Sequence, residues 1–132
     1  MRKEVAKKWI KALRSGKYKQ GQEYLKYYNQ KHQPRHCCLG VLCELYNDEM
    51  KKNHKKTLSI KTDFDGSPLK NGYVKFDGKH DFLPSVVRKW AGIKNRDGKI
   101  NRGSYNSLAG MNDSGKTFKT ISNVIEKNVE NL

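Results

Sequence analysis

The most apolar stretch of the chain reads CCLGVLCELY and runs from residue 37 to residue 46. Four of its apolar residues recur at the three- and four-residue spacing of one helical face: Cys38, Val41, Leu42 and Leu45. A stripe of this kind becomes buried against other elements. We therefore expect a buried central helix in this stretch.

Amphipathic helices are predicted at both ends of the chain. Residues 2–14 place apolar side chains on one stripe and lysines on the remaining surface. The pair Ser15-Gly16 is a natural stop, because glycine accepts the left-handed conformation that ends a helix. The last helix follows Thr117 as its cap and carries a second apolar stripe, made of Phe118, Ile121, Val124, Ile125 and Val129.

Extended structure is predicted between these helices. Residues 17–35 favour extended chain, and residues 57–61 and 73–76 alternate in the manner of two strands. Three dipeptides supply left-handed turn residues around them: Asp65-Gly66, Asn71-Gly72 and Asp77-Gly78. Together these signals predict a small antiparallel sheet.

Shorter elements complete the predicted fold. Residues 48–56 read as a charged, exposed connection, residues 84–92 as a short helix that begins at a proline and ends at a glycine, and residues 107–111 as one or two helical turns. The fold class is therefore α+β. We expect a small single domain, residues 1–132, with an N-terminal amphipathic helix, a buried central helix, a small antiparallel sheet and a C-terminal helix.

Composition favours one globular domain in a reducing compartment. A chain of 132 residues closes one core, and thirteen aromatic side chains help to fill it. No window approaches the ~20 consecutive apolar residues of a membrane span, and the start lacks a signal peptide, so we expect a cytoplasmic protein. Three cysteines packed into seven positions, Cys37, Cys38 and Cys43, are the opposite of a spaced disulfide framework, and we expect reduced thiols.

The net charge of +15 is concentrated at the start of the chain. Residues 1–35 hold eleven Lys and Arg against two acidic residues, which leaves +9 in about a quarter of the length. A field of this sign attracts phosphates or acidic protein surfaces and speeds their capture. The alternative is a lysine-rich surface that only keeps the protein soluble.

Tyrosines and cations alternate in residues 17–35, which is typical of surfaces that stack on bases while holding phosphates. A half-exposed hairpin whose tyrosines cover the core is the structural alternative. Lys116 is a further candidate, because it lies near a predicted helix start where backbone N–H groups favour anions. The predicted contact surface comprises Lys7, Lys8, Lys11, Arg14, Lys17, Lys19, Tyr24, Tyr27, Tyr28, Arg35 and Lys116.

A cluster of histidines and cysteines invites comparison with a zinc site. His32, His36, Cys37, Cys38 and Cys43 lie within twelve residues, but no second ligand pair exists elsewhere, and adjacent cysteines point in different directions. A cysteine nucleophile would need a base held beside it, and sequence neighbours in extended chain project oppositely. We expect packed thiols, no metal, no cofactor and no enzymatic activity; a small thiol or zinc module remains the alternative.

Three blocks of sequence resemble a family of small hypothetical proteins encoded by tailed phages and prophages. The blocks are residues 9–20 (WIKALRSGKYKQ), residues 37–43 (CCLGVLC) and residues 112–118 (NDSGKTF), with Leu83-Pro84 and Trp90-Ala91-Gly92 between the last two. The resemblance transfers no catalytic or binding residues. It implies an accessory protein that acts in the cytoplasm of an infected bacterium.

The function expected from charge and resemblance is stoichiometric binding rather than catalysis. We expect a counter-defence protein, similar in action to an anti-CRISPR inhibitor, that binds a nucleic acid, a nucleic-acid-handling host complex or a nucleotide signal. An inhibitor that binds an acidic host-protein surface is the alternative.

Overall fold

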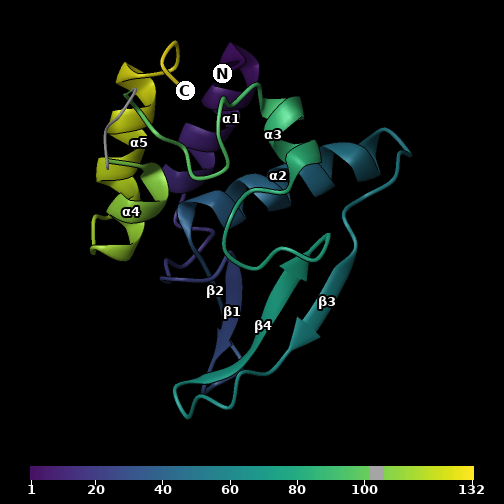
Figure 1. The fold of residues 1–132 in the computed structure, drawn as a ribbon. Coiled ribbons are helices and arrows are strands. Elements are labelled where there is room, and N and C mark those ends of the chain that lie inside the picture. The colour runs from purple at the N-terminus through teal and green to yellow at the C-terminus, as the bar shows by residue number, and fades with distance from the viewer. Residues whose placement is uncertain (102–105) are drawn as a thin grey trace.

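The computed structural model describes residues 1–101 and 106–132, which form an α+β domain of five helices and one four-stranded antiparallel sheet (Figure 1). The helices gather into one layer, and the sheet projects away from it. In chain order the elements are α1 (Lys3–Arg14), β1 (Lys26–Asn29), β2 (Pro34–His36), α2 (Cys38–Lys52), β3 (Ile60–Asp63), β4 (Lys70–Phe76), α3 (Ser85–Ala91), α4 (Leu108–Asp113) and α5 (Phe118–Lys127).

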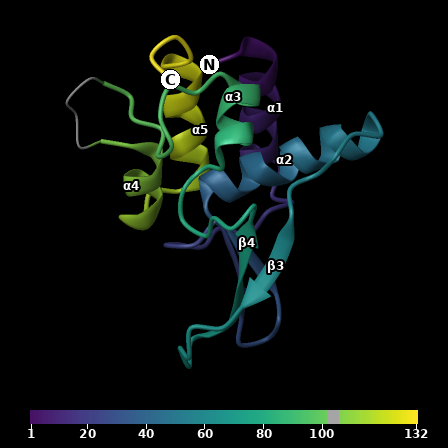
Figure 2. The ribbon, with the colours of Figure 1, turned by 45° about the vertical axis from the view of Figure 1, so that its right-hand side comes forward.

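The predicted terminal helices are confirmed as α1 and α5, which pack side by side. Figure 2 shows them next to each other, although their sequences lie at opposite ends of the chain. Gly16 follows α1 with φ +76°, and the Thr117 side chain caps α5 by accepting from the Thr120 N–H. Local signals therefore place both helices.

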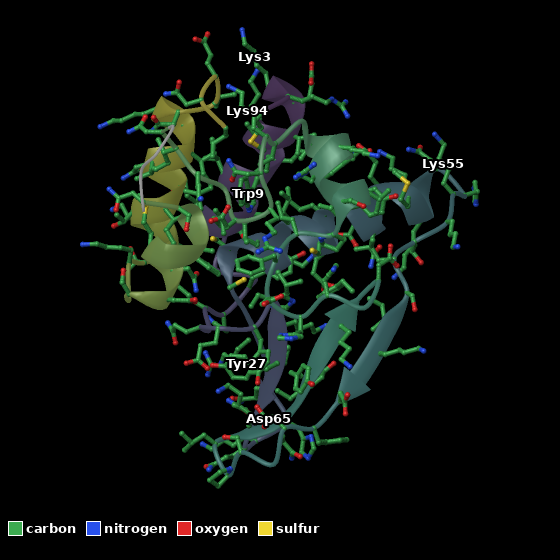
Figure 3. All side chains as sticks on the ribbon, in the orientation of Figure 1. Lys3, Trp9, Tyr27, Lys55, Asp65 and Lys94 are labelled. Carbon is green, nitrogen blue, oxygen red and sulfur yellow. The ribbon has the colours of Figure 1, made fainter. Side chains whose placement is uncertain are left out.

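Two tryptophans lie in the helical layer. Trp9 of α1 is fully buried, and its indole N–H donates to the Cys38 carbonyl at 2.9 Å, which joins α1 to the start of α2 (Figure 3). Trp90 of α3 packs edge-on against Tyr46 and donates its indole N–H to Glu49 of α2. Each indole thus reaches a hydrogen-bond acceptor on α2.

The central helix is confirmed as buried but is longer than predicted. It continues to Lys52, so the predicted connection at residues 48–56 is wrong in its first half. The polar residues there form the outer face of the helix rather than a loop. Asn47 remains buried, and its side-chain oxygen accepts from the Leu58 N–H at 2.8 Å, which fixes the chain after the helix.

Gly40 allows α2 to lie directly against the backbone that leads into β1. A Cβ atom at this position would lie 1.7 Å from the Leu25 carbonyl oxygen. The Cys37 N–H donates to the same oxygen at 3.2 Å. The distance between helix and strand is therefore set by the absence of a side chain at residue 40.

We expect Gly40→Ala to destabilise the fold by about 3 kcal/mol, because backbone must move to admit the methyl group. The sign of the change in stability is diagnostic, because in an unobstructed helix interior alanine is about 1 kcal/mol more stabilising than glycine. Gly110→Ala in α4, at an exposed position, is the control for the same substitution in another helix and should cost less than Gly40→Ala. Chemical denaturation of both variants measures the difference; equal stabilities would contradict the close approach.

The sheet has the strand order β2-β1-β4-β3, and every neighbour is antiparallel. The predicted strand at residues 57–61 lies instead at 60–63, and the one at 73–76 extends back to residue 70. Asn71-Gly72 is therefore part of β4 and not a turn, although Gly72 keeps a positive φ of +102°. The pairing between β1 and β4 shifts register nearby, and this irregularity accounts for a glycine inside a strand.

Residues 17–35 are extended only in part. β1 and β2 form a hairpin, whereas residues 17–25 mostly follow turns and bends. Two residues of that segment bond to the backbone of His36 in β2. The His36 N–H donates to the Lys19 carbonyl at 2.9 Å, and the Gly21 N–H donates to the His36 carbonyl at 2.8 Å. The segment thereby covers the outer edge of β2.

The two predicted short helices are confirmed. α3 follows Pro84 and ends at Gly92, which has φ +71°, and α4 begins after Ser107, whose hydroxyl accepts from the Gly110 N–H. No helix among residues 1–101 and 106–132 is both long enough and apolar enough to cross a membrane.

Asn112, at the end of α4, connects three distant segments. Its side chain is fully buried; the amide nitrogen donates to the Gly21 carbonyl at 2.7 Å, and the oxygen accepts from the Cys38 N–H at 3.1 Å and from the Gln20 side chain at 2.9 Å. Gln20 in turn accepts from the Phe118 N–H at 3.0 Å. The three sequence blocks quoted above therefore meet at one polar cluster.

Asn112→Ala should lower the free energy of unfolding markedly. The variant leaves a buried N–H and a buried carbonyl without partners, each costing about 1–3 kcal/mol. Asn53→Ala, at an exposed position after α2, is the control for loss of an amide side chain. Thermal unfolding compares the two; equal melting temperatures would show that the cluster carries no stability.

Candidate anion-binding site

A pocket of about 530 Å³ opens where the β1–β2 hairpin, α2 and residues 17–19 meet. Four cations line it: Lys17, Lys19, Lys26 and Arg35. Tyr18 and His36 also contribute, and Glu44 is the one carboxylate among the described residues of its lining. We refer to this feature as the basic pocket. Its excess of positive charge makes it a candidate site for an anion.

The fold brings these side chains together from three separate elements. Lys26 and His36 are direct partners in the β1–β2 pairing, so their side chains lie on one face of the sheet. Lys19 precedes the residue that bridges to His36. Glu44 reaches the same place from α2, 3.7 Å from the Lys26 amine and 3.5 Å from the His36 ring.

His36 is the most unusual group in the basic pocket. It is 3% exposed, and neither ring nitrogen makes a hydrogen bond to a described residue. Its Nε2 lies near the Glu44 carboxylate without hydrogen-bond geometry, and the Tyr18 ring packs edge-on against it at 5.2 Å. The Glu44 carboxylate, 3.5 Å from the ring, offsets part of the cost of burying this polar side chain.

Glu44 is held ionised beside these groups. Its partial burial raises the carboxyl pKa, but the nearby His36 and Lys26 lower it by more, so the pKa lies below its ordinary value. The carboxylate offsets one of the four cations, and the pocket retains a net positive charge.

A second pocket adjoins the first and shares Tyr18 and Lys19 with it. It measures about 510 Å³, and its further cations are Arg14 and Lys119. Arg14 is fixed by α5, since its guanidinium donates to Asn123 at 2.8 Å and lies 3.4 Å from Glu126. Positive charge therefore continues from the hairpin across residues 17–20 to the start of α5.

The predicted cations are divided between this region and the outer faces of α1. Lys17, Lys19 and Arg35 line the basic pocket, and Arg14 lines the adjoining one. Lys116 directly precedes Thr117 of the adjoining pocket, and its carbonyl accepts from Gln20 at 2.7 Å. The three others occupy α1: Lys7 and Lys11 lie beside Arg14 and Glu126, and Lys8 forms an ion pair with Glu49 at 3.3 Å.

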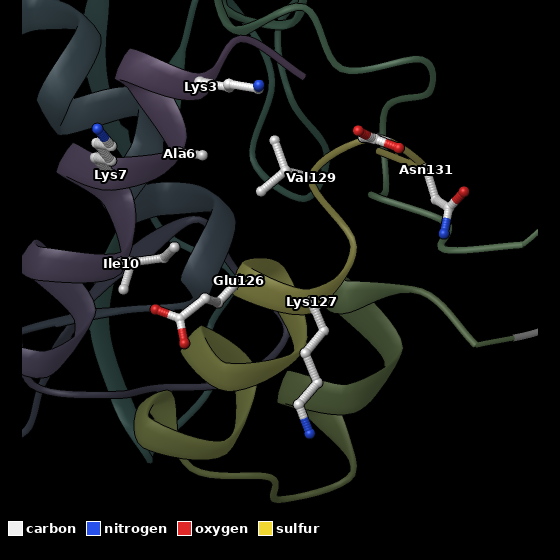
Figure 4. Close-up of a pocket in the computed structure, with 9 residues that line it drawn as sticks. Lys3, Ala6, Lys7, Ile10, Glu126, Lys127, Val129 and Asn131 are labelled. Carbon is white, nitrogen blue, oxygen red and sulfur yellow. The ribbon is translucent and has the colours of Figure 1, made fainter.

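The groove between α1 and α5 is a weaker candidate (Figure 4). Its volume is about 490 Å³, and its floor is apolar, with Ala6, Ile10 and Val129. Three lysines line it, but two glutamates lie among them: Lys3, Lys7, Lys127, Glu126 and Glu130. The charges nearly balance, so the groove attracts anions less strongly than the basic pocket.

The predicted tyrosines do not line the basic pocket. Tyr24 stacks on Tyr73 with ring centres 4.6 Å apart and donates its hydroxyl to Asp65 at 2.6 Å. The Lys70 amine lies 5.3 Å from the ring centres of both Tyr24 and Tyr27. Tyr28 lies on the opposite face of β1 from Tyr27, the face that carries Lys26, and the Lys26 amine is 5.7 Å from its ring centre. Their rings are thus engaged within the protein, and Tyr18 is the pocket's aromatic residue.

The prediction missed Lys26, His36, Glu44 and Lys119 as site residues. Lys26 and His36 become neighbours only through the hairpin register, which follows from pairing and not from either residue alone. Glu44 depends on where α2 crosses the sheet. Lys119 could have been found, because it lies in the first turn of a helix whose cap had been recognised.

The three cysteines are buried and free, as packed thiols would be; Cys37 immediately precedes α2, and Cys38 and Cys43 lie on it. Burial raises the pKa of Cys37 to about 12 and raises those of Cys38 and Cys43 well above the ordinary range. In the part of the chain that the structure describes, no three His, Cys, Asp or Glu side chains are arranged to hold a metal ion.

We expect the native protein to resist thiol reagents at pH 8. The thiolate is the reactive species, and raised pKa values together with burial keep the thiols protonated and inaccessible. Titration with Ellman's reagent should give no fast reaction in buffer and three equivalents in denaturant. Rapid modification of the folded protein would contradict the burial.

Fold and site together define a small α+β protein with a cationic pocket at the junction of its two layers. The chain belongs to the family whose model is described as "Domain of unknown function (DUF8296)", which matches residues 1–129. No curated protein and no solved structure matches the chain.

Proposed function

We propose that this protein binds a phosphate-bearing partner through the basic pocket and its adjoining pocket, without catalysing a reaction on it. The observation that carries the proposal is the gathering of four cations around a single pocket whose described lining holds one carboxylate. Net positive charge over the whole protein assists capture, because it draws anions from a distance.

Phosphate is the chemistry that this lining fits best. Lysines and an arginine provide charge-assisted donors, and an arginine can bind two phosphate oxygens at once. The volume lies within the range of sites for small organic ligands, and we expect it to accept a ligand of nucleotide size.

A nucleotide and a nucleic acid strand are two sources of the same phosphate group. A strand would extend from the basic pocket into the adjoining one, along Lys19 toward Lys119. A free nucleotide would occupy the basic pocket alone. Variants of the two pockets distinguish these sources. A change in the adjoining pocket should weaken binding of a strand, whereas only a change in the basic pocket should weaken binding of a free nucleotide.

We propose further that the protein is a phage accessory protein that counteracts a bacterial defence by stoichiometric binding. The support is the resemblance of three sequence blocks to small phage and prophage proteins. Those blocks meet at Asn112, next to the segment that carries Lys19. Restored phage plating on defence-bearing cells that express the protein, and its loss in pocket variants, is the corresponding cellular test.

The double variant Lys19→Ala/Arg35→Ala should weaken binding to both labelled single-stranded DNA and mononucleotides at least about tenfold. For the strand, the slope of log affinity against log salt should become shallower by about 0.7 per lost phosphate contact. Fluorescence anisotropy at several salt concentrations measures the strand, and calorimetry measures the nucleotide. A flat salt titration for the wild-type protein would refute phosphate binding.

Lys55→Ala/Lys56→Ala is the matched control, since it removes the same charge from the exposed segment after α2. It should bind nearly as the wild type does. An equal loss of affinity in both double variants would indicate that the overall positive charge of the protein, and not a defined site, attracts the ligand. Capture of an acidic protein from nuclease-treated lysate, with no affinity for nucleotides or strands, would favour the alternative of an acidic host-protein target.

A further inference from the structure

The two edges of the sheet are protected differently. At one edge, residues 19–21 bridge to His36 and cover β2. At the other edge β3 ends the sheet; all four of its residues are exposed, and no other described strand pairs with its outer side (Figure 1). An open edge presents unpaired N–H and C=O groups to another strand.

The hydrogen-bond pattern shows which backbone groups of β3 point outward. The Asp77 N–H donates to the Ser59 carbonyl at 2.9 Å, so residues 59 and 77 form a hydrogen-bonded pair. Bonded and non-bonded pairs alternate along an antiparallel ladder. Residues 61 and 63 therefore bond toward β4, and Ile60 and Thr62 direct their backbone groups to the open side, whereas the N–H of the following Phe64 donates to the Asp63 carboxylate at 2.8 Å.

We propose that two copies of this chain pair through β3 in an antiparallel arrangement centred on Thr62. A two-fold axis beside Thr62 places it opposite its own counterpart as a hydrogen-bonded pair. The same register sets Ile60 opposite Phe64 of the second copy, and Lys61 opposite Asp63 of the second copy. Each strand therefore presents an apolar partner and a counterion to the side chains of the other.

The apolar side of this register is complementary. Ile60 is 51% exposed and Phe64 69% exposed. A Cβ at Gly72 would lie 3.1 Å from Thr62 and 3.2 Å from Phe64, which shows that these two side chains share one face of the sheet. Pairing would cover both apolar residues on both copies, and exposed apolar side chains gathered on one edge are typical of contact sites.

The charged side is complementary as well. In the monomer Lys61 lies directly opposite Lys75 of β4, an unfavourable pair of like charges. Asp63 accepts from Lys75 at 3.0 Å and from the Phe64 N–H at 2.8 Å, and a carboxylate has further acceptor sites. The dimer gives Lys61 a counterion in a non-bonded pair, where facing side chains approach most closely.

Two features limit the strength of the dimer. Each copy carries a net charge of +15, so the copies repel at long range, and the strand is only four residues long. Salt screens the repulsion. Dimerisation should therefore increase with salt, whereas phosphate binding decreases with it, and the two proposals succeed or fail independently.

Sedimentation equilibrium of the full chain over a range of concentrations tests the pairing. Lys61→Glu should weaken association at least about tenfold, because the two-fold axis creates two repulsive pairs from one substitution. The swap Lys61→Glu/Asp63→Lys should restore it. Lys51→Glu, which makes the same charge change at the end of α2, should leave it unchanged or slightly stronger. Wild-type protein that stays monomeric at about 1 mM in high salt would overturn the proposal.

A disulfide trap tests the register. Thr62→Cys should oxidise to a covalent dimer faster than Lys61→Cys, because residue 62 faces itself within disulfide distance, whereas residue 61 faces residue 63. The native cysteines are buried and do not compete. Equal rates for the two variants would exclude pairing about Thr62, even if the protein is dimeric.

Discussion

The buried side chain of Asn112 is the constraint on which the arrangement of this protein depends. One amide satisfies backbone groups of two segments that are far apart in sequence, at Gly21 and Cys38, and it also holds Gln20. A buried amide retains its position only while all its partners do. The end of α4, the start of α2 and the segment before β1 are therefore fixed relative to one another, and local changes at any of them act on the others.

The basic pocket is a consequence of that junction. Lys19 lies next to the residue held by Asn112, and Gly40 brings α2 close enough to the strand segment for Glu44 to reach His36. Neither the helical layer nor the sheet contains the pocket alone. Lys26, Arg35 and His36 come from the β1–β2 hairpin, Lys17 and Lys19 come from the segment after α1, and Glu44 comes from α2.

Local signals predicted the helices well, because a cap, a left-handed glycine and an apolar stripe are properties of adjacent residues. The predicted ends of the strands were less accurate, because they depend on pairing between distant residues: β3 begins later than predicted, and β4 begins earlier and includes Gly72. The same distinction applies to the site. The charge of residues 17–35 indicated Lys19 and Arg35, but His36 joins them only through the hairpin register. The tyrosines were expected at the surface, whereas long-range partners such as Asp65 draw them into contacts of their own.

The position of the two indoles has a spectroscopic consequence. Trp9 and Trp90 are the tryptophans of the chain, and both lie in the helical layer; the aromatic residues of the sheet are tyrosines and phenylalanines. Emission excited above the tyrosine band therefore reports on the helices, and loosening of the sheet alone would leave it almost unchanged. Tyrosine absorbance or near-ultraviolet dichroism is the appropriate signal for the strands, and comparing the two probes would show whether both layers melt together.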